Sequence, residues 1–398
     1  MPAFDRHSMK GAYGALLVIF LLLLGCASQT PAQTPPASQT STPPATSPPA
    51  VQEPSTPPAT VPPEVIAEPE KPPTTETPAQ VANATVAPPV REELKAPAPP
   101  ALYKGFWMPC MFLQSDCQPM NKPASLKEAG ANTAGIAPNV KINAEGKAQL
   151  DVPIDVAEQR LAELAKQYYA ENISLMISIE TQYVQNFNEG MQAGGPGAFP
   201  TGVADKAGYF DEYNAIVEKF AVMAEKYHVA IFSPMNEPDM KFGVAASSAW
   251  SQQVLPLVRK SYSGKILWKM GKPSSAGTSA IDFKGYDIIG LDMTPGGYGP
   301  EGSLSGYPAL VSSTLSSAQG WAQRDGVAEV MFTEFGVWGG ALSWNEADKA
   351  AAHAAVFQAG KGKVTGFFVL DPPPDLDRPI TGTESYDVAK EWFTKKLG

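Results

Sequence analysis

The stretch Ala230-Ile-Phe-Ser-Pro-Met-Asn-Glu-Pro-Asp239 begins as a short apolar run. The run is followed by two polar residues, Asn236 and Glu237, and then by a second proline and an aspartate. Residues 210–227, directly before it, carry apolar side chains at spacings of three and four, which is typical of an amphipathic helix. The apolar run is bounded by turn-forming residues and therefore predicts a buried strand. A helix that leads into such a strand is the repeating unit of α/β proteins.

The same unit recurs throughout residues 101–398. Eight strands are predicted, at Tyr103–Met108, Thr133–Ala137, Ser174–Ile179, Ala230–Pro234, Lys265–Met270, Asp287–Asp292, Glu329–Glu334 and Thr365–Leu370. Helices are predicted between and after them, at Val156–Tyr169, Phe210–Tyr227, Ser248–Ser261, Ser305–Arg324, Asn345–Gly360 and Tyr386–Leu397. Eight units in about 300 residues favour an α/β fold of the (β/α)8 TIM barrel type over an open doubly wound sheet. Because no Gly-x-Gly-x-x-Gly follows the first strand, a dinucleotide-binding fold has no support.

Two of the predicted strands end in a glutamate. The fourth leads into Glu237, and the seventh ends at Glu334. In a TIM barrel these ends meet at the face where the chemistry takes place. Two carboxyls there are what cleavage of a glycosidic bond needs, one protonated to donate to the leaving oxygen and one ionised to attack. The alternative is that each glutamate only caps a following helix, for which Pro238 would be a suitable first residue.

These motifs resemble clan A of the glycoside hydrolases, (β/α)8 barrels with an Asn-Glu pair after strand four and a nucleophilic glutamate after strand seven. The resemblance spans the whole domain in strand order. It implies that Glu237 is the general acid/base, that Glu334 is the nucleophile of a retaining mechanism, and that Asn236 binds the 2-hydroxyl of the sugar. It also implies a β-linked polysaccharide or oligosaccharide substrate, of the mannan, glucan or galactan type. No cofactor or metal is expected, since two carboxylates suffice.

Aromatic residues near the strand ends are candidates for substrate contacts. Trp107 and Trp338 can stack on the apolar faces of sugar rings, or they can pack in the barrel rim. Tyr298 lies in a glycine-rich loop after the sixth strand, where many clan members have a tyrosine, and it can hydrogen-bond Glu334. The long segment 181–208 either walls a polysaccharide cleft, which favours endo action, or is an insertion.

Charged residues end other strands. Glu180, Asp292 and Asp371 can each bind a sugar hydroxyl or satisfy buried backbone donors. Glu180 and Asp371 are the preferred substrate-binding candidates. Lys269, near the end of the fifth strand, can pair with one of these carboxylates.

The sequence departs from the clan pattern. The eighth strand ends without the tryptophan that is common there, and the only histidines are His7, His228 and His353. His228 precedes the fourth strand and belongs at the opposite face, and His353 belongs to an outer helix. The placement of these histidines argues against a Ser-His-Asp triad and against a histidine zinc site. A non-catalytic carbohydrate-binding or cell-envelope lipoprotein on the same barrel remains the alternative.

The first hundred residues predict export and a tether. Residues 1–26 have a positive start, an apolar run and the ending Leu23-Leu24-Gly25-Cys26, which resembles the lipobox of bacterial lipoproteins. The resemblance implies that Cys26 carries lipid and anchors the protein, on the outer membrane if there are two. An ordinary secretory signal is the alternative. Residues 27–100 hold about half of the 40 prolines and no aromatic residue, which predicts a disordered linker.

Cysteine and charge fit the same picture. Cys110 and Cys117 can form a disulfide in an exported protein, or they can be two reduced, buried thiols. The net charge of −10 argues against a nucleic-acid partner, because phosphate contacts need clustered Lys and Arg.

Overall fold

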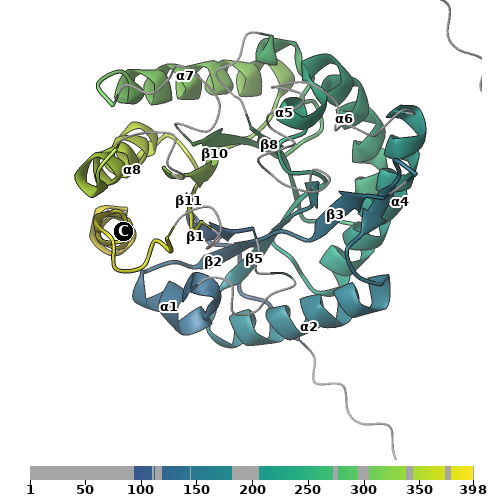
Figure 1. The fold of residues 1–398 in the computed structure, drawn as a ribbon, viewed down its shortest axis with the longest axis horizontal. Coiled ribbons are helices and arrows are strands. Elements are labelled where there is room, and N and C mark those ends of the chain that lie inside the picture. Colours follow the sequence, from purple (N-terminus) through teal and green to yellow (C-terminus); the bar gives the residue numbers. More distant parts are fainter. Residues whose placement is uncertain are drawn as a thin grey trace, which may run out of the picture. The chain divides into compact units, whose positions relative to one another are not determined.

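Eight parallel strands close into a barrel in the spatial order β1-β11-β10-β9-β8-β7-β5-β2. Their bounds are Tyr103–Met108 (β1), Thr133–Ile136 (β2), Ser174–Ser178 (β5), Ile231–Ser233 (β7), Lys265–Met270 (β8), Ile288–Met293 (β9), Glu329–Phe335 (β10) and Gly366–Leu370 (β11). Figure 1 shows these strands as an inner ring inside the helices. The predicted TIM barrel is confirmed, and β7 and β10 are its fourth and seventh strands in chain order.

The computed structural model describes residues 94–109, 112, 119–143, 145–181, 206–271, 277–294, 304–337, 344–372 and 378–397. They all lie in one unit of the chain, Val86–Gly398. Leu94 and Ala96 already pack against its core. Among the described residues, no helix combines the length and the apolar character that crossing a membrane requires.

The helices surround the barrel. Their bounds are Pro123–Glu128 (α1), Ile154–Ala170 (α2), Lys206–Lys226 (α4), Pro238–Phe242 (α5), Val244–Arg259 (α6), Tyr307–Asp325 (α7), Glu346–Gly360 (α8) and Glu384–Glu391 (α9). In Figure 1, α2, α4, α6, α7 and α8 cover the outside of the ring. The predicted helix Tyr386–Leu397 is present as α9, but its second half, Trp392–Lys396, is a π-helical turn instead of α-helix. That turn buries both Trp392 and Phe393.

Alternation along the strands divides the apolar side chains into two cores. One fills the barrel and consists of Tyr103, Trp107, Ala137, Met176, Ile231, Leu267, Ile288, Met331, Phe368 and Leu370. The larger core joins the outward faces of the strands to the helices. The middle of the barrel is thus packed with side chains, and polar groups can gather only at its two ends.

A small second sheet was not predicted from the sequence. It has the order β4-β3-β6, with bounds Ala148–Leu150, Asn139–Ile142 and Glu180–Thr181. Because β6 directly follows β5, this sheet extends the wall of the barrel beyond the end of β5. It therefore fixes Glu180 beside the mouth, where β6 pairs with Asn139 of β3.

Candidate active site

The turn after β7 places Glu237 at the barrel mouth. Its backbone is left-handed, with φ 50°, and it forms the N-cap of α5, which begins at Pro238. The backbone N–H of Asn236 donates to the carbonyl oxygen of Ile179, 2.7 Å away, and holds this turn against the end of β5. Gly271 leaves the space that the glutamate side chain occupies, since a Cβ on Gly271 would lie 2.7 Å from Cβ of Glu237.

A β-bulge in β10 turns Glu334 toward the mouth. Met331 points into the barrel and Phe332 points outward, so strict alternation would send the side chain at 334 outward as well. The register with β9 shifts between Phe332 and Glu334, which makes Thr333 the extra residue. Both Thr333 and Glu334 therefore reach the polar group at the mouth, and Phe335 returns to the outer core.

A buried lysine lies at the centre of the site. Nζ of Lys269 donates to Oδ2 of Asp292 at 2.5 Å and to Oε2 of Glu334 at 2.7 Å. It also lies 4.5 Å from the centre of the Trp107 ring. The other carboxylate oxygen of Asp292 accepts from Oγ1 of Thr333 at 2.8 Å. We call Glu237, Lys269, Asp292 and Glu334 the mouth cluster.

The two glutamates are close enough to act on one bond. Glu237, Asp292 and Glu334 each offer a carboxylate oxygen, and these three atoms lie within 4.8 Å of one another. Such a group can also hold a metal ion. Here the ammonium group of Lys269 already supplies a positive charge bonded to two of the three carboxylates, so proton transfer between unlike carboxyls is the chemistry that this arrangement fits best.

The surroundings separate the protonation states. Burial, and then the charges of Glu334 and Asp292, raise the pKa of Glu237 well above its usual range. Burial is also the main cause that raises the pKa of Asp292 to about 7, although Lys269 opposes it. Burial alone would lower the pKa of Lys269, but the neighbouring carboxylates raise it above its ordinary value. The site thus favours the neutral acid form of Glu237 and the cationic form of Lys269.

Free acceptor positions remain on the mouth cluster and next to it. Among the described residues, the side chain of Glu237 and Oε1 of Glu334 have no hydrogen-bond partner. Nδ2 of Asn236 donates to Glu180, which also binds the buried Lys241. Oδ1 of Asn236 is buried and lacks a partner in the described part of the chain. These atoms can therefore receive hydroxyl groups of a substrate.

Two of the predicted contact residues are engaged within the protein. Trp107 is 1% exposed and lies below Lys269, packed so closely that a Cβ on Gly135 would be 2.8 Å from its ring. Asp371 accepts from the backbone amides of Ile380, at 3.0 Å, and Met120, at 3.4 Å. Substrate contact by Trp107 and Asp371 stays a prediction. Tyr298, Trp338, Cys26, Cys110 and Cys117 lie outside the described residues.

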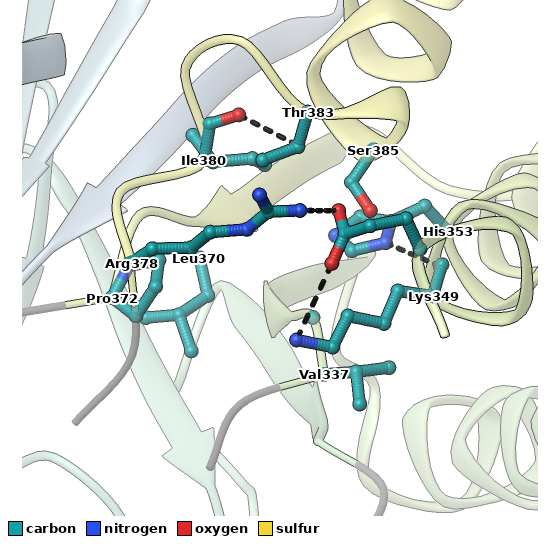
Figure 2. Close-up of a pocket in the computed structure, with 11 residues that line it drawn as sticks. Val337, Lys349, His353, Leu370, Pro372, Arg378, Ile380, Thr383 and Ser385 are labelled. Atoms are coloured by element: carbon teal, nitrogen blue, oxygen red, sulfur yellow. Dashed lines mark hydrogen bonds and ion pairs between the residues drawn. The ribbon is translucent and has the colours of Figure 1, made fainter. Parts of the chain in front are cut away.

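A separate pocket lies behind β10 and β11. It is open to solvent and has about 330 Å³ of empty space, solvent included, and Figure 2 shows the side chains that line it. Arg378 and Lys349 both pair with Glu346 there. Nδ1 of His353 bonds to the carbonyl of Lys349, while Nε2 is buried and has no partner among the described residues. None of the mouth cluster residues lines this pocket.

The predicted pairing of Lys269 with a strand-end carboxylate is confirmed by its contact with Asp292, whereas the contacts of Lys269 with Glu334 and of Lys241 with Glu180 were not predicted. Their partners Glu334 and Glu180 are 65 and 61 residues away along the chain, and only closure of the barrel brings them together. For Lys269 the available signal was a lysine on an otherwise apolar, buried strand, because an unpaired buried ammonium group is costly. Lys241 lies in the short helix α5, where no such strand pattern marks it.

Comparisons with known proteins identify the fold. No family model matches the sequence, and no curated protein matches it significantly. A β-1,4-mannanase of family GH113 is 15% identical with TM-score 0.52 over 74% of this chain and 98% of its own. The GH113 β-mannanase of Alicyclobacillus acidocaldarius is 16% identical with TM-score 0.55 over 74% of this chain and 97% of its own. The endo-β-1,4-mannanase of Thermotoga petrophila is 12% identical with TM-score 0.52 over 75% of this chain and 78% of its own. The chain therefore has the barrel fold that these glycoside hydrolases have.

Proposed function

We propose that the protein is a retaining glycoside hydrolase that cleaves β-linked polysaccharides or oligosaccharides. One observation carries the proposal: Glu237, after the fourth barrel strand, and Glu334, at the end of the seventh, offer oxygens within 4.8 Å of each other. Retaining enzymes keep their two carboxyl groups about 5–5.5 Å apart, whereas inverting enzymes leave about 6.5–9.5 Å for a water molecule. The short separation supports direct attack by one carboxylate.

The environments of the two glutamates support different roles. Glu237, whose raised pKa keeps it protonated, gives its proton to the glycosidic oxygen as Oε1 of Glu334 attacks the anomeric carbon. The bond to the leaving sugar breaks, and a glycosyl ester forms on Glu334. Glu237, now ionised, then takes a proton from water, and the water oxygen displaces Glu334. Two inversions give a product with the original anomeric configuration.

Asn236 is the proposed contact to the 2-hydroxyl next to the attacked carbon. Its buried Oδ1 lacks a partner among the described residues, and Glu180 fixes the amide through Nδ2. A hydrogen bond to that hydroxyl strengthens in the transition state. Since β-1,4-mannanases share the fold, β-mannan is the first substrate to test, followed by β-glucan and β-galactan. Endo action is proposed from the length of the segment 181–208.

The first test is sugar release by the purified protein from these three polysaccharides, with Glu334→Gln alongside. We expect kcat to fall by about 10³-fold or more in this variant, because removing a nucleophile leaves only the remaining binding groups. Glu329→Gln, at the other end of β10, is the matched control and should keep full activity. Retention predicts that the first product seen by NMR is the β-anomer.

Three outcomes would decide against the proposal. Activity that survives Glu334→Gln would remove the mechanism, and an initial α-anomer would replace retention by inversion. If the folded protein releases no sugar but binds one of the polysaccharides, the non-catalytic carbohydrate-binding function is correct instead.

A further inference from the structure

We propose that Lys269 is a positioning residue that holds the nucleophile by one oxygen and leaves the other free to attack. The inference rests on the proposed function and concerns a residue that the two-carboxylate mechanism leaves unused. Its basis is geometric: Lys269 is 0% exposed, and its Nζ reaches Oε2 of Glu334 at 2.7 Å, while Oε1 has no partner among the described residues.

The directions around Nζ leave little freedom. An ammonium group has three N–H donors. One points to Glu334, one to Asp292, and the Trp107 ring lies 4.5 Å from Nζ. Asp292 is itself fixed, because its second oxygen accepts from Thr333, the bulge residue. The chain of contacts from Thr333 to Glu334 therefore locks the carboxylate plane of the nucleophile.

The charge balance fits a positioning role better than a stabilising one. A buried ion pair gains little free energy of folding, because desolvation of both groups offsets their attraction. With Glu237 protonated, and above the pKa of about 7 that burial gives Asp292, one cation faces the two anions Asp292 and Glu334, so one negative charge remains at the mouth. That charge suits a transition state in which positive charge develops on the sugar.

Strand β8 offers a matched control. Lys265, four residues before Lys269 and on the same inward face, pairs with Glu329 and lies 5.2 Å from the Tyr103 ring. The arrangement of lysine, glutamate of β10 and aromatic ring of β1 thus occurs twice, once at each end of the barrel. Only the copy at the mouth includes a proposed catalytic residue.

The experiment compares Lys269→Met, Asp292→Asn and Lys265→Met in kcat, KM and pH profile. Lys269→Met should lower kcat by about 100-fold with little change in KM, as for loss of one preorganised donor. Loss of the Lys269 cation raises the pKa of Glu237 further, so the alkaline limb of the pH–rate profile should move to higher pH. Asp292→Asn removes an anion and should move that limb to lower pH. Lys265→Met should match the wild type.

The outcomes separate this inference from the proposed function. If wild type is active and Glu334→Gln is not, yet Lys269→Met keeps the wild-type kcat and pH profile, the positioning role is wrong and the glycosidase stands. If wild type is inactive on all substrates, the proposed function fails first. Should Lys269→Met fail to fold, Asp292→Asn decides through kcat, because Asp292 holds Lys269 in place: an unchanged kcat overturns the inference, and a lower kcat with little change in KM supports it.

Discussion

The backbone of Glu237 is held in an unfavourable conformation. A left-handed φ in a residue other than glycine costs about 1–3 kcal/mol and persists only when the surroundings impose it. Here they do so through the helix that begins at Pro238 and through Gly271, whose missing side chain makes room for the glutamate. The carboxyl of Asp239 further fixes Gly271 by accepting from its amide at 3.0 Å.

A methyl group at position 271 should therefore disturb the proposed acid. In Gly271→Ala the new Cβ would lie 2.7 Å from Cβ of Glu237, so the glutamate has to move. We expect kcat/KM to fall by about 10- to 100-fold, because a displacement of about 1 Å is enough for such a loss. Gly320→Ala in α7 is the control, since its Cβ meets nothing within 4 Å. Equal activity of the two variants would contradict the role of Gly271.

At the scale of elements, α8 packs against β10 through an unusual histidine. The ring of His353 lies 5.8 Å from that of Phe335, the residue that follows Glu334. Burial lowers the pKa of His353 to about 4. In the unfolded chain this histidine binds a proton below about pH 6.5, whereas in the folded chain it does so only below about pH 4. The free energy of unfolding therefore keeps its full value above pH 6.5 and decreases as the pH falls from 6.5 to 4.

We expect this histidine to cost about 3 kcal/mol of folding stability between pH 7 and pH 4. Urea unfolding of the wild type and of His353→Asn at both pH values measures it. Asp371, with its pKa raised to about 6 by burial, acts in the opposite direction, but equally in both proteins. The wild type should therefore lose more stability on acidification than the variant. If both proteins lose the same free energy of unfolding between pH 7 and pH 4, the pKa of His353 is not lowered and the prediction is wrong.

The elements also show how far sequence reasoning reaches. The eight strands and both glutamates could be predicted because apolar runs and strand-end polar residues are local patterns. The bulge at Thr333 has no such pattern, since its only effect is on register with the neighbouring strands. The two-residue strand β6 and the contacts of Lys269 with Glu334 and of Lys241 with Glu180 join distant parts of the chain, so they could be identified only in the closed barrel.

At the scale of the whole molecule, we propose that a lipid on Cys26 anchors the domain through the linker 27–100. The linker's composition favours extended polyproline segments, which rise about 3.1 Å per residue, so its reach is on the order of 100 Å. A chain with net charge −10 is repelled by an anionic membrane surface, but only within a Debye length of about 10 Å. A tether of this kind would let the barrel domain reach the proposed polymeric substrate at a distance from the membrane.

Cys26→Ser should release the protein from the membrane fraction without changing its activity on soluble substrate. Loss of the acyl chains removes about 0.8 kcal/mol of membrane binding for each buried methylene. Cell fractionation followed by immunoblotting measures the distribution, and Cys110→Ser, which leaves the lipobox intact, serves as the control. A wild-type protein that is already free of the membrane would favour the ordinary secretory signal.

The closure of the barrel also has a consequence for how the chain must fold. The first strand pairs with the last, Tyr103 beside Gly366, so the ring has two open edges until the end of the domain has been synthesised. Contacts between such distant residues form slowly, and exposed strand edges attract other chains. A chain that stops before β11 would keep both edges open, which makes early termination an aggregation hazard rather than a simple loss of one strand.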